Sequence, residues 1–153
     1  MPNPNWIAGF SSAEGCFLVS IYPPPAGLRH SNKNKISQFV QLIFKISQHH
    51  RDKNLLELIA KYLNCGQVIY HSEKAKVFLV GKFVDINNKI LLIFKAHSIQ
   101  GIKQLDYQDF CEIATLIGDP HPPLGRGWVG KHLSPIGIAK IQLIKDRMNT
   151  KRK

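Results

Sequence analysis

The chain has 153 residues, enough for one ordinary domain with a single core and too few for two. Lysine and arginine number 21 against 10 aspartate and glutamate residues, so the formal net charge is +11. This excess predicts a polyanionic partner, nucleic acid before a membrane, since no hydrophobic run is long enough to span a bilayer and no N-terminal signal pattern is visible. A basic globular domain without such a partner is the plainer alternative.

Cysteine and histidine give no sign of a metal site. Cys16, Cys65 and Cys111 are odd in number and far apart, and they have no paired metal spacing. The pair His49 and His50 has no cysteine or acidic partner at a known zinc spacing. We therefore expect buried, reduced thiols and a structural or phosphate-contacting role for the histidines.

The N-terminal segment carries clear signals for a helix. Asn3 suits an N-cap, Pro4 suits the first helical position, and Gly15 suits the residue just past the C-terminal end, so a helix is predicted over residues 4–14. Glu14 then lies where the helix macrodipole favours a cation and opposes a carboxylate. Some other requirement must keep this charge at the helix end.

Two strands are predicted after this helix. Residues 16–22 are rich in apolar and aromatic side chains and end at three prolines, which cannot continue a sheet ladder. Residues 37–48 alternate with a period of two, which predicts a strand with one core face and one mostly polar face. The predicted core face holds Val40, Leu42, Phe44 and Ile46, and the other face holds Gln41, Ile43, Lys45 and Ser47.

The remainder of the chain adds a helix, a second hairpin and three more helices. Asp52 is expected to cap a helix that Gly66 ends. The predicted elements after it are strands over residues 67–71 and 76–84 and helices over residues 87–94, 106–117 and 135–148. Four strands in two hairpins indicate an α+β fold, in which helices cover one face of an antiparallel sheet.

The other face of this sheet is predicted to remain open. Its side chains include donors, acceptors and cations suited to base edges and phosphates. They are Ser20, Tyr22, Gln41, Lys45, Ser47, Lys76 and Lys82. Any one of them could be an ordinary solvated side chain, but together with a net charge of +11 the set indicates a nucleic-acid surface.

The stretch IAGFSSAEG, from Ile7 to Gly15, resembles the nine-residue signature of the LAGLIDADG homing endonucleases, with Glu14 at the acidic position. The segments FKISQHHRD, LNCG, GIKQLDYQDF and LSPIGIAKIQLIKDRMN resemble the fungal organellar branch of that family. The resemblance implies one LAGLIDADG half-fold, a helix-strand-strand-helix-strand-strand unit followed by helices, whose four-stranded antiparallel sheet forms a saddle. It also implies a single domain over residues 1–148, a basic tail over residues 149–153, and an intron-encoded protein of the mitochondrion.

The resemblance implies a metal-dependent nuclease centred on Glu14. Mg²⁺, or Mn²⁺ or Ca²⁺ at the same site, would be held by the Glu14 carboxylate and the backbone carbonyl of Ala13, which offsets the unfavourable dipole. Gln48 matches a position that helps to order solvent in this family, and Lys103 matches the active-site lysine. Without the resemblance, the Glu14, Gln48 and Lys103 side chains would be interpreted as ordinary surface groups.

The resemblance also implies that the open face saddles the major groove of double-stranded DNA. The outward positions are Leu18, Ser20, Tyr22, Gln41, Ile43, Lys45 and Ser47, and the loop residues Arg29, Lys33 and Lys35 would reach farther along the duplex. Leu18 and Ile43 are apolar where polar side chains are expected. Either they contact thymine methyl groups, or the register is shifted by one residue, which would move every side chain to the other face.

A single signature is present, whereas cleavage of both strands needs two acids. The family uses either a homodimer of single-motif chains or one chain with two halves, and FSSAEGCF resembles the C-terminal half of the double-motif members. We expect a homodimer formed through the first helix, which cuts a long palindromic target and leaves staggered ends. The predicted interface residues are Trp6, Ile7, Ala8, Gly9, Phe10, Ser12 and Ala13.

Two other classes of function remain open. One is a binding module on the same fold, either an RNA-splicing maturase or a DNA-binding half-domain without cleavage of its own. The other is a basic ribosome-associated α+β protein, in which Glu14 would be unimportant. An acid at position 14 favours the endonuclease, because a pure binder gains nothing from a carboxylate aimed at phosphates.

Overall fold

The computed structural model describes residues 2–23, 38–118 and 135–151. The elements are α1 (Pro4–Glu14), β1 (Gly15–Tyr22), β2 (Phe39–His49), α2 (Lys53–Leu63), β3 (Gln67–Ser72), β4 (Ala75–Val80), α3 (Phe83–Asp85), a π-helical segment (Ile86–Ile90), α4 (Leu91–Ala96), α5 (Lys103–Ile117) and α6 (Pro135–Lys145). Short 3₁₀ turns cover His50–Asp52 and Asn149–Lys151. The predicted α+β fold is confirmed.

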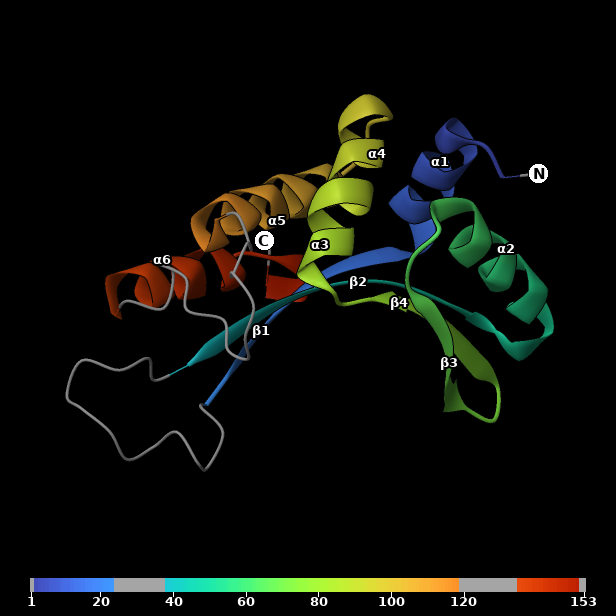
Figure 1. Ribbon diagram of the computed structural model, residues 1–153, viewed down its shortest axis with the longest axis horizontal. Helices are drawn as coiled ribbons and strands as arrows, with labels where there is room; N and C mark the ends of the chain where they lie inside the picture. Colours follow the sequence, from blue (N-terminus) through green and yellow to red (C-terminus); the bar gives the residue numbers. More distant parts are fainter. Residues whose placement is uncertain (1, 24–37, 119–134, 152–153) are drawn as a thin grey trace.

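The four strands form one antiparallel sheet in the order β1-β2-β4-β3. The helices lie on its convex side, and no described element covers its concave side (Figure 1). We call this concave side the open face. On it, Leu18 pairs with Ile43 and Ser20 pairs with Gln41. The prediction of helices on a single face of the sheet is therefore confirmed.

The core lies between the sheet and the helices and contains five fully buried phenylalanines. Phe17 of β1 is at their centre, with its ring centroid 5.2 Å from those of Phe44 and Phe110 and 5.8 Å from that of Phe94. Along β2, Leu42, Phe44 and Ile46 are buried on the helix side, as the alternation predicts. The predicted register of β1 and β2 is confirmed, and a shift by one residue is excluded.

Two glycines that contact core residues are required by close approaches of neighbouring atoms. A Cβ atom on Gly15 would come within 2.6 Å of the Ser11 carbonyl oxygen, although the Gly15 φ of −71° suits any residue. A Cβ atom on Gly66 would come within 2.6 Å of the Phe78 ring, and its φ is +74°. Gly15 therefore serves the packing of β1 against α1, while Gly66 also supplies a left-handed turn.

Several predicted boundaries are wrong. Asn64, with a φ of 50°, ends α2 in the left-handed conformation, whereas Gly66 had been expected to do so. β4 stops at Val80, so the predicted strand over residues 76–84 was too long, and a helical run begins at Phe83. The helix expected over residues 106–117 starts earlier, at Lys103.

The three cysteines are free thiols, as expected, but they are half-buried rather than buried. Burial raises the pKa of each thiol, so all three stay protonated at neutral pH. No helix within the described residues is long and apolar enough to cross a membrane.

Two adjacent serines in α1 make opposite contributions to stability. The Ser11 hydroxyl is fully buried and has no hydrogen-bond partner among the described residues. The Ser12 hydroxyl donates to the Ala8 carbonyl at 2.7 Å and accepts from the Gln100 amide at 2.9 Å. Ser11→Ala is expected to raise the free energy of unfolding by about 1 kcal/mol, because it removes an unsatisfied polar group and favours the helix.

Ser12→Ala is the matched control and should lower the same free energy by about 1 kcal/mol. Urea unfolding followed by circular dichroism measures both. A Ser11→Ala protein less stable than the wild type would contradict this assignment.

Candidate active site

Glu14 is the last residue of α1, and its side chain is exposed where the chain turns into β1. The ammonium group of Lys103, in the first turn of α5, donates to the Ala13 carbonyl oxygen at 2.9 Å. A cation thus lies at the negative end of the α1 dipole, one residue from the carboxylate. The structure brings together three of the residues singled out from the sequence, Ala13, Glu14 and Lys103.

A second lysine lies near this helix end. Lys45 of β2 pairs with Cys16 of β1 on the open face. Burial raises the pKa of the Cys16 thiol, while the charges of Lys45 and Lys103 oppose that rise. Both ammonium groups therefore lie close enough to the start of β1 to act electrostatically on the Cys16 thiol.

The segment between α4 and α5 forms hydrogen bonds with residues near both ends of α1. The His97 imidazole contacts the Asn5 side-chain oxygen at 2.7 Å, and the Gln100 amide donates to the Ser12 hydroxyl at 2.9 Å. Together with the Lys103 contact, these bonds fix the start of α5 against the end of α1. Neither His97 nor Gln100 could be singled out from local sequence patterns, because both contacts join residues about 90 positions apart.

Gln48 lies near the end of β2, two residues past Ile46, which pairs with Gly15. It is therefore at the same end of the sheet as Glu14, and it is half-buried. Gln48 pairs with Lys76, so both side chains share the helix side of the sheet with Ile46 and Phe78. The prediction that Lys76 lies on the open face is wrong; its ammonium group lies 4.8 Å from the centre of the Tyr70 ring.

The other predicted open-face residues lie where alternation placed them. These are Leu18, Ser20 and Tyr22 in β1 and Gln41, Ile43, Lys45 and Ser47 in β2. Lys82 follows β4 and is exposed, and it lines a hollow of about 340 Å³ with Gln41 and Gln67. Arg29, Lys33 and Lys35 lie outside the described residues.

The predicted interface of α1 is only partly available. Ile7 and Ala8 are 0% and 4% exposed and belong to the core of the chain itself, so their assignment to an interface is wrong. Ser12 is engaged by Gln100. Four residues remain at the surface, Trp6, Gly9, Phe10 and Ala13, and we call them the pairing face.

Two features of the pairing face would allow a second helix to pack closely against it. The Trp6 and Phe10 rings stack with centroids 4.9 Å apart. A Cβ atom added to Gly9 would meet nothing within 4 Å, so nothing in the described chain covers that position. Small residues beside stacked rings allow a second helix to approach closely.

The C-terminal turn supports the site from the outer edge of β1. Asn149 donates through its backbone amide to the buried Asp106 carboxylate and through its side-chain amide to the Phe17 carbonyl, both at 2.9 Å. Asp106 is one turn beyond Lys103 in α5, so Asn149 joins the lysine-bearing helix to the strand after Glu14. Asn149 is also the first residue of the basic tail expected over residues 149–153, and it is hydrogen-bonded to the domain.

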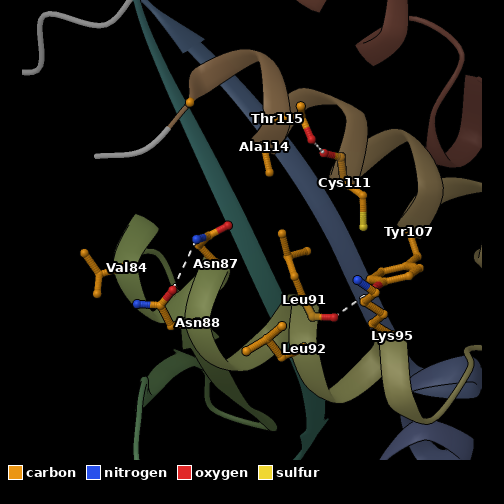
Figure 2. A pocket seen from close by; sticks show the side chains of 11 residues that line it. Val84, Asn87, Asn88, Leu91, Leu92, Lys95, Tyr107, Cys111, Ala114 and Thr115 are labelled. Atoms are coloured by element: carbon orange, nitrogen blue, oxygen red, sulfur yellow. Dashed lines mark hydrogen bonds between the residues drawn. The ribbon is translucent and has the colours of Figure 1, made fainter. Parts of the chain in front are cut away.

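A larger groove, of about 670 Å³, lies on the helix side between the helical run Phe83–Ala96 and α5 (Figure 2). Among the described residues that line it, the titratable side chains are Lys95, Tyr107 and Cys111, and none is a carboxylate. The Tyr107 hydroxyl is already committed, since it donates to the Leu91 carbonyl at 2.8 Å. Without an acid or base for hydrolysis, this groove is a poorer candidate active site than the end of α1.

The chemistry at the end of α1 suits a divalent cation shared with a bound phosphate. No group of three or more His, Cys, Asp or Glu side chains in the described part of the chain could hold a metal. The Glu14 carboxylate and the Ala13 carbonyl are hard oxygen donors on adjacent residues. Mg²⁺ typically takes one or two carboxylates and completes its shell with water and substrate phosphates, so these donors fit it.

Comparison with known proteins points to one family. The model of the family described as LAGLIDADG endonuclease matches residues 7–114. Among curated proteins, Probable intron-encoded endonuclease 3 of Neurospora crassa is 35% identical over 95% of this chain and 24% of its own length. Probable intron-encoded endonuclease 2 of the same fungus is 32% identical over 94% of this chain and 27% of its own length.

Solved structures of LAGLIDADG homing endonucleases have a fold similar to that of this chain. The LAGLIDADG homing endonuclease I-LtrWI bound to target DNA superposes with a TM-score of 0.83 and 38% identity, over 99% of this chain and 46% of that one. For I-SmaMI bound to cleaved DNA, the TM-score is 0.82 and the identity 33%, over 99% of this chain and 45% of that one. The chain spans about a quarter of these curated relatives and less than half of these solved chains.

Asn149 offers a test of how the site is held together. Its φ of 56° is left-handed, which glycine adopts freely and alanine does not. Asn149→Gly should lower the free energy of unfolding by about 1 kcal/mol, through the lost bond to Phe17. Asn149→Ala should lower it by about 1 kcal/mol more, because backbone strain is added. Equal urea midpoints for the wild type and the glycine variant would contradict a contribution from the side-chain amide.

Proposed function

The chain belongs to the LAGLIDADG endonuclease family, and we propose that it is a half-fold of a homing endonuclease that cuts double-stranded DNA at a specific site. The observation that carries this proposal is the exposed Glu14 carboxylate at the start of β1, next in the chain to Ala13, whose carbonyl oxygen accepts from the Lys103 ammonium group. An acid and a cation at that position suit phosphodiester hydrolysis. The DNA complexes of I-LtrWI and I-SmaMI support the same activity.

Glu14 and the Ala13 carbonyl would hold the divalent cation, Mg²⁺ or a substitute such as Mn²⁺ or Ca²⁺. The Lys103 ammonium group, which donates to that carbonyl in this structure, would then move toward the phosphate. When bound, such a cation polarises the phosphate and lowers the pKa of water. Lys103 places its positive charge one residue from Glu14, where it offsets the charge that develops on the attacked phosphate. Gln48 carries both a donor and an acceptor at this end of the sheet, which suits it to orient the attacking water.

The pairing face of α1 is proposed to meet the same face of a second copy of the chain. Two-fold pairing would set two Glu14 residues side by side, one for each DNA strand, and would produce staggered ends in a palindromic target. The exposed Trp6 ring, the half-buried Phe10 ring stacked on it and the uncovered Gly9 support this arrangement. The solved relatives are about twice as long as this chain, so a homologous second half is the alternative partner.

The relatives also bear on the cellular location. Curated relatives carry intron-encoded names in Neurospora crassa, and another, from Podospora anserina, is described as a protein in ND4 intron 1. We therefore propose that this chain is intron-encoded and acts on mitochondrial DNA.

Glu14→Gln tests the nuclease. The variant should lose at least 100-fold in cleavage rate, because it removes the anionic oxygen donor while keeping the shape. The substrate is a randomised library of palindromic duplexes in Mg²⁺, with EDTA as a second control, and sequencing of the cut ends is the readout. Glu57→Gln, an exposed acid in α2 paired with Lys53, is the matched control and should cut normally. Cleavage by Glu14→Gln at the wild-type rate would refute the assignment.

Gly9→Lys tests the pairing face. Apart from its two chain neighbours and the backbone of α1, no described residue has an atom within 4 Å of the new Cβ, so the half-fold should stay intact while the second helix is held away. We expect a dimer for the wild type and a monomer for the variant in sedimentation at micromolar concentration. Ala139→Lys, at an exposed position of α6, is the control and should remain dimeric. A monomeric wild type would reject the homodimer in favour of a homologous second half.

A further inference from the structure

Two aliphatic side chains face each other at the centre of the open face. Leu18 of β1 and Ile43 of β2 are paired residues in the register, and both are half-buried. Residues on either side of them along the strands, such as Phe17 and Phe44, point into the core. Leu18 and Ile43 therefore belong to the outer surface, and we call this pair the apolar rung.

The neighbouring rungs on both sides are polar or charged. Ser20 pairs with Gln41 on one side, and Cys16 pairs with Lys45 on the other. Along β1 and β2, the apolar rung thus interrupts a run of hydrogen-bonding and cationic groups. Farther across the sheet, Leu79 and Val77 of β4 pair with Lys45 and Ser47 and add apolar side chains to the same face. No described element of the chain covers it, because all the helices lie on the opposite side of the sheet (Figure 1).

An apolar side chain on a face that reads a major groove has a single matching group there. Of the four bases, only thymine presents a methyl group on its major-groove edge, whereas the others present donors and acceptors. An aliphatic pair whose Cβ atoms are about 5 Å apart would leave such donors and acceptors without partners. It would instead bury a methyl group from water.

We propose that the Leu18–Ile43 rung recognises the C5-methyl group of a thymine in each half of the DNA target, an inference that rests on the proposed DNA cleavage. Leu18 is four residues beyond Glu14, which is about 13 Å of extended strand. With about 3.4 Å per base step, the thymine lies about four base pairs from the phosphate that Glu14 addresses. The Ser20–Gln41 rung then faces the duplex about two base pairs farther out.

The first experiment removes the methyl group from the DNA. A target selected by cleavage, or by binding in Ca²⁺, is resynthesised with deoxyuridine in place of each thymine in turn. Loss of the recognised methyl group should weaken binding about 4-fold, and loss in both half-sites about 15-fold. Replacing the same thymine with cytosine and then with 5-methylcytosine should recover part of the loss.

Variants of the rung must abolish this dependence. Leu18→Ala and Ile43→Ala should bring the affinity ratio of thymine to deoxyuridine near 1 at that position. Ser20→Ala, in the next rung, is the matched control and should keep the wild-type ratio. Both aliphatic residues are only half-buried, and thermal unfolding checks that each variant is folded.

The outcomes separate this inference from the function on which it rests. If the protein binds or cuts a selected duplex but tolerates deoxyuridine at every thymine, the proposed recognition of methyl groups is wrong while the nuclease stands. The same holds if the ratio survives in both rung variants. If no duplex is bound or cut under any condition, the proposed function fails and the inference fails with it.

Discussion

The packing of the Phe17 side chain in the core determines which side chains of β1 lie on the open face and where α5 is positioned. Its ring contacts Phe44 in the sheet, Phe94 in α4, and Tyr107 and Phe110 in α5, with centroid separations between 5.2 and 5.8 Å. Since side chains alternate along a strand, burying Phe17 directs Leu18 and Ser20 outward. The same contacts position α5, whose first residue is Lys103. One aromatic cluster therefore determines both which residues lie on the open face and where the lysine of the candidate active site is positioned.

The end of α1 shows how local and tertiary electrostatics differ. A carboxylate at a helix C-terminus is locally unfavourable, and nothing within α1 compensates for Glu14. The compensation comes from Lys103, about 90 residues later, whose ammonium group donates a hydrogen bond to the Ala13 carbonyl oxygen. A mismatch between a residue and its local structure is therefore useful information, because it marks a place where distant groups must contribute.

Sequence periodicity predicted the parts of this structure that depend on one strand or helix at a time. The alternation of Leu42, Phe44 and Ile46 was enough to orient β2. It could not choose between Asn64 and Gly66 as the end of α2, because both residues tolerate a positive φ and both adopt one. Nor could it tell which small or apolar residues of α1 face outward, and so Ile7 and Ala8 were assigned to an interface although they are buried. Lys76 was misplaced for a related reason, since the face of β4 depends on its pairing with β2.

Asn149 also has a consequence for how the protein is made. β1 is an edge strand, and an edge strand with free backbone groups can pair with other chains. The Asn149 side-chain amide donates a hydrogen bond to the Phe17 carbonyl oxygen of this strand, but the two residues are 132 positions apart. During synthesis, that carbonyl therefore remains without this partner until residue 149 has left the ribosome. Until then β1 presents an edge that can pair with other chains, and unpaired strand edges of this kind favour aggregation of folding intermediates.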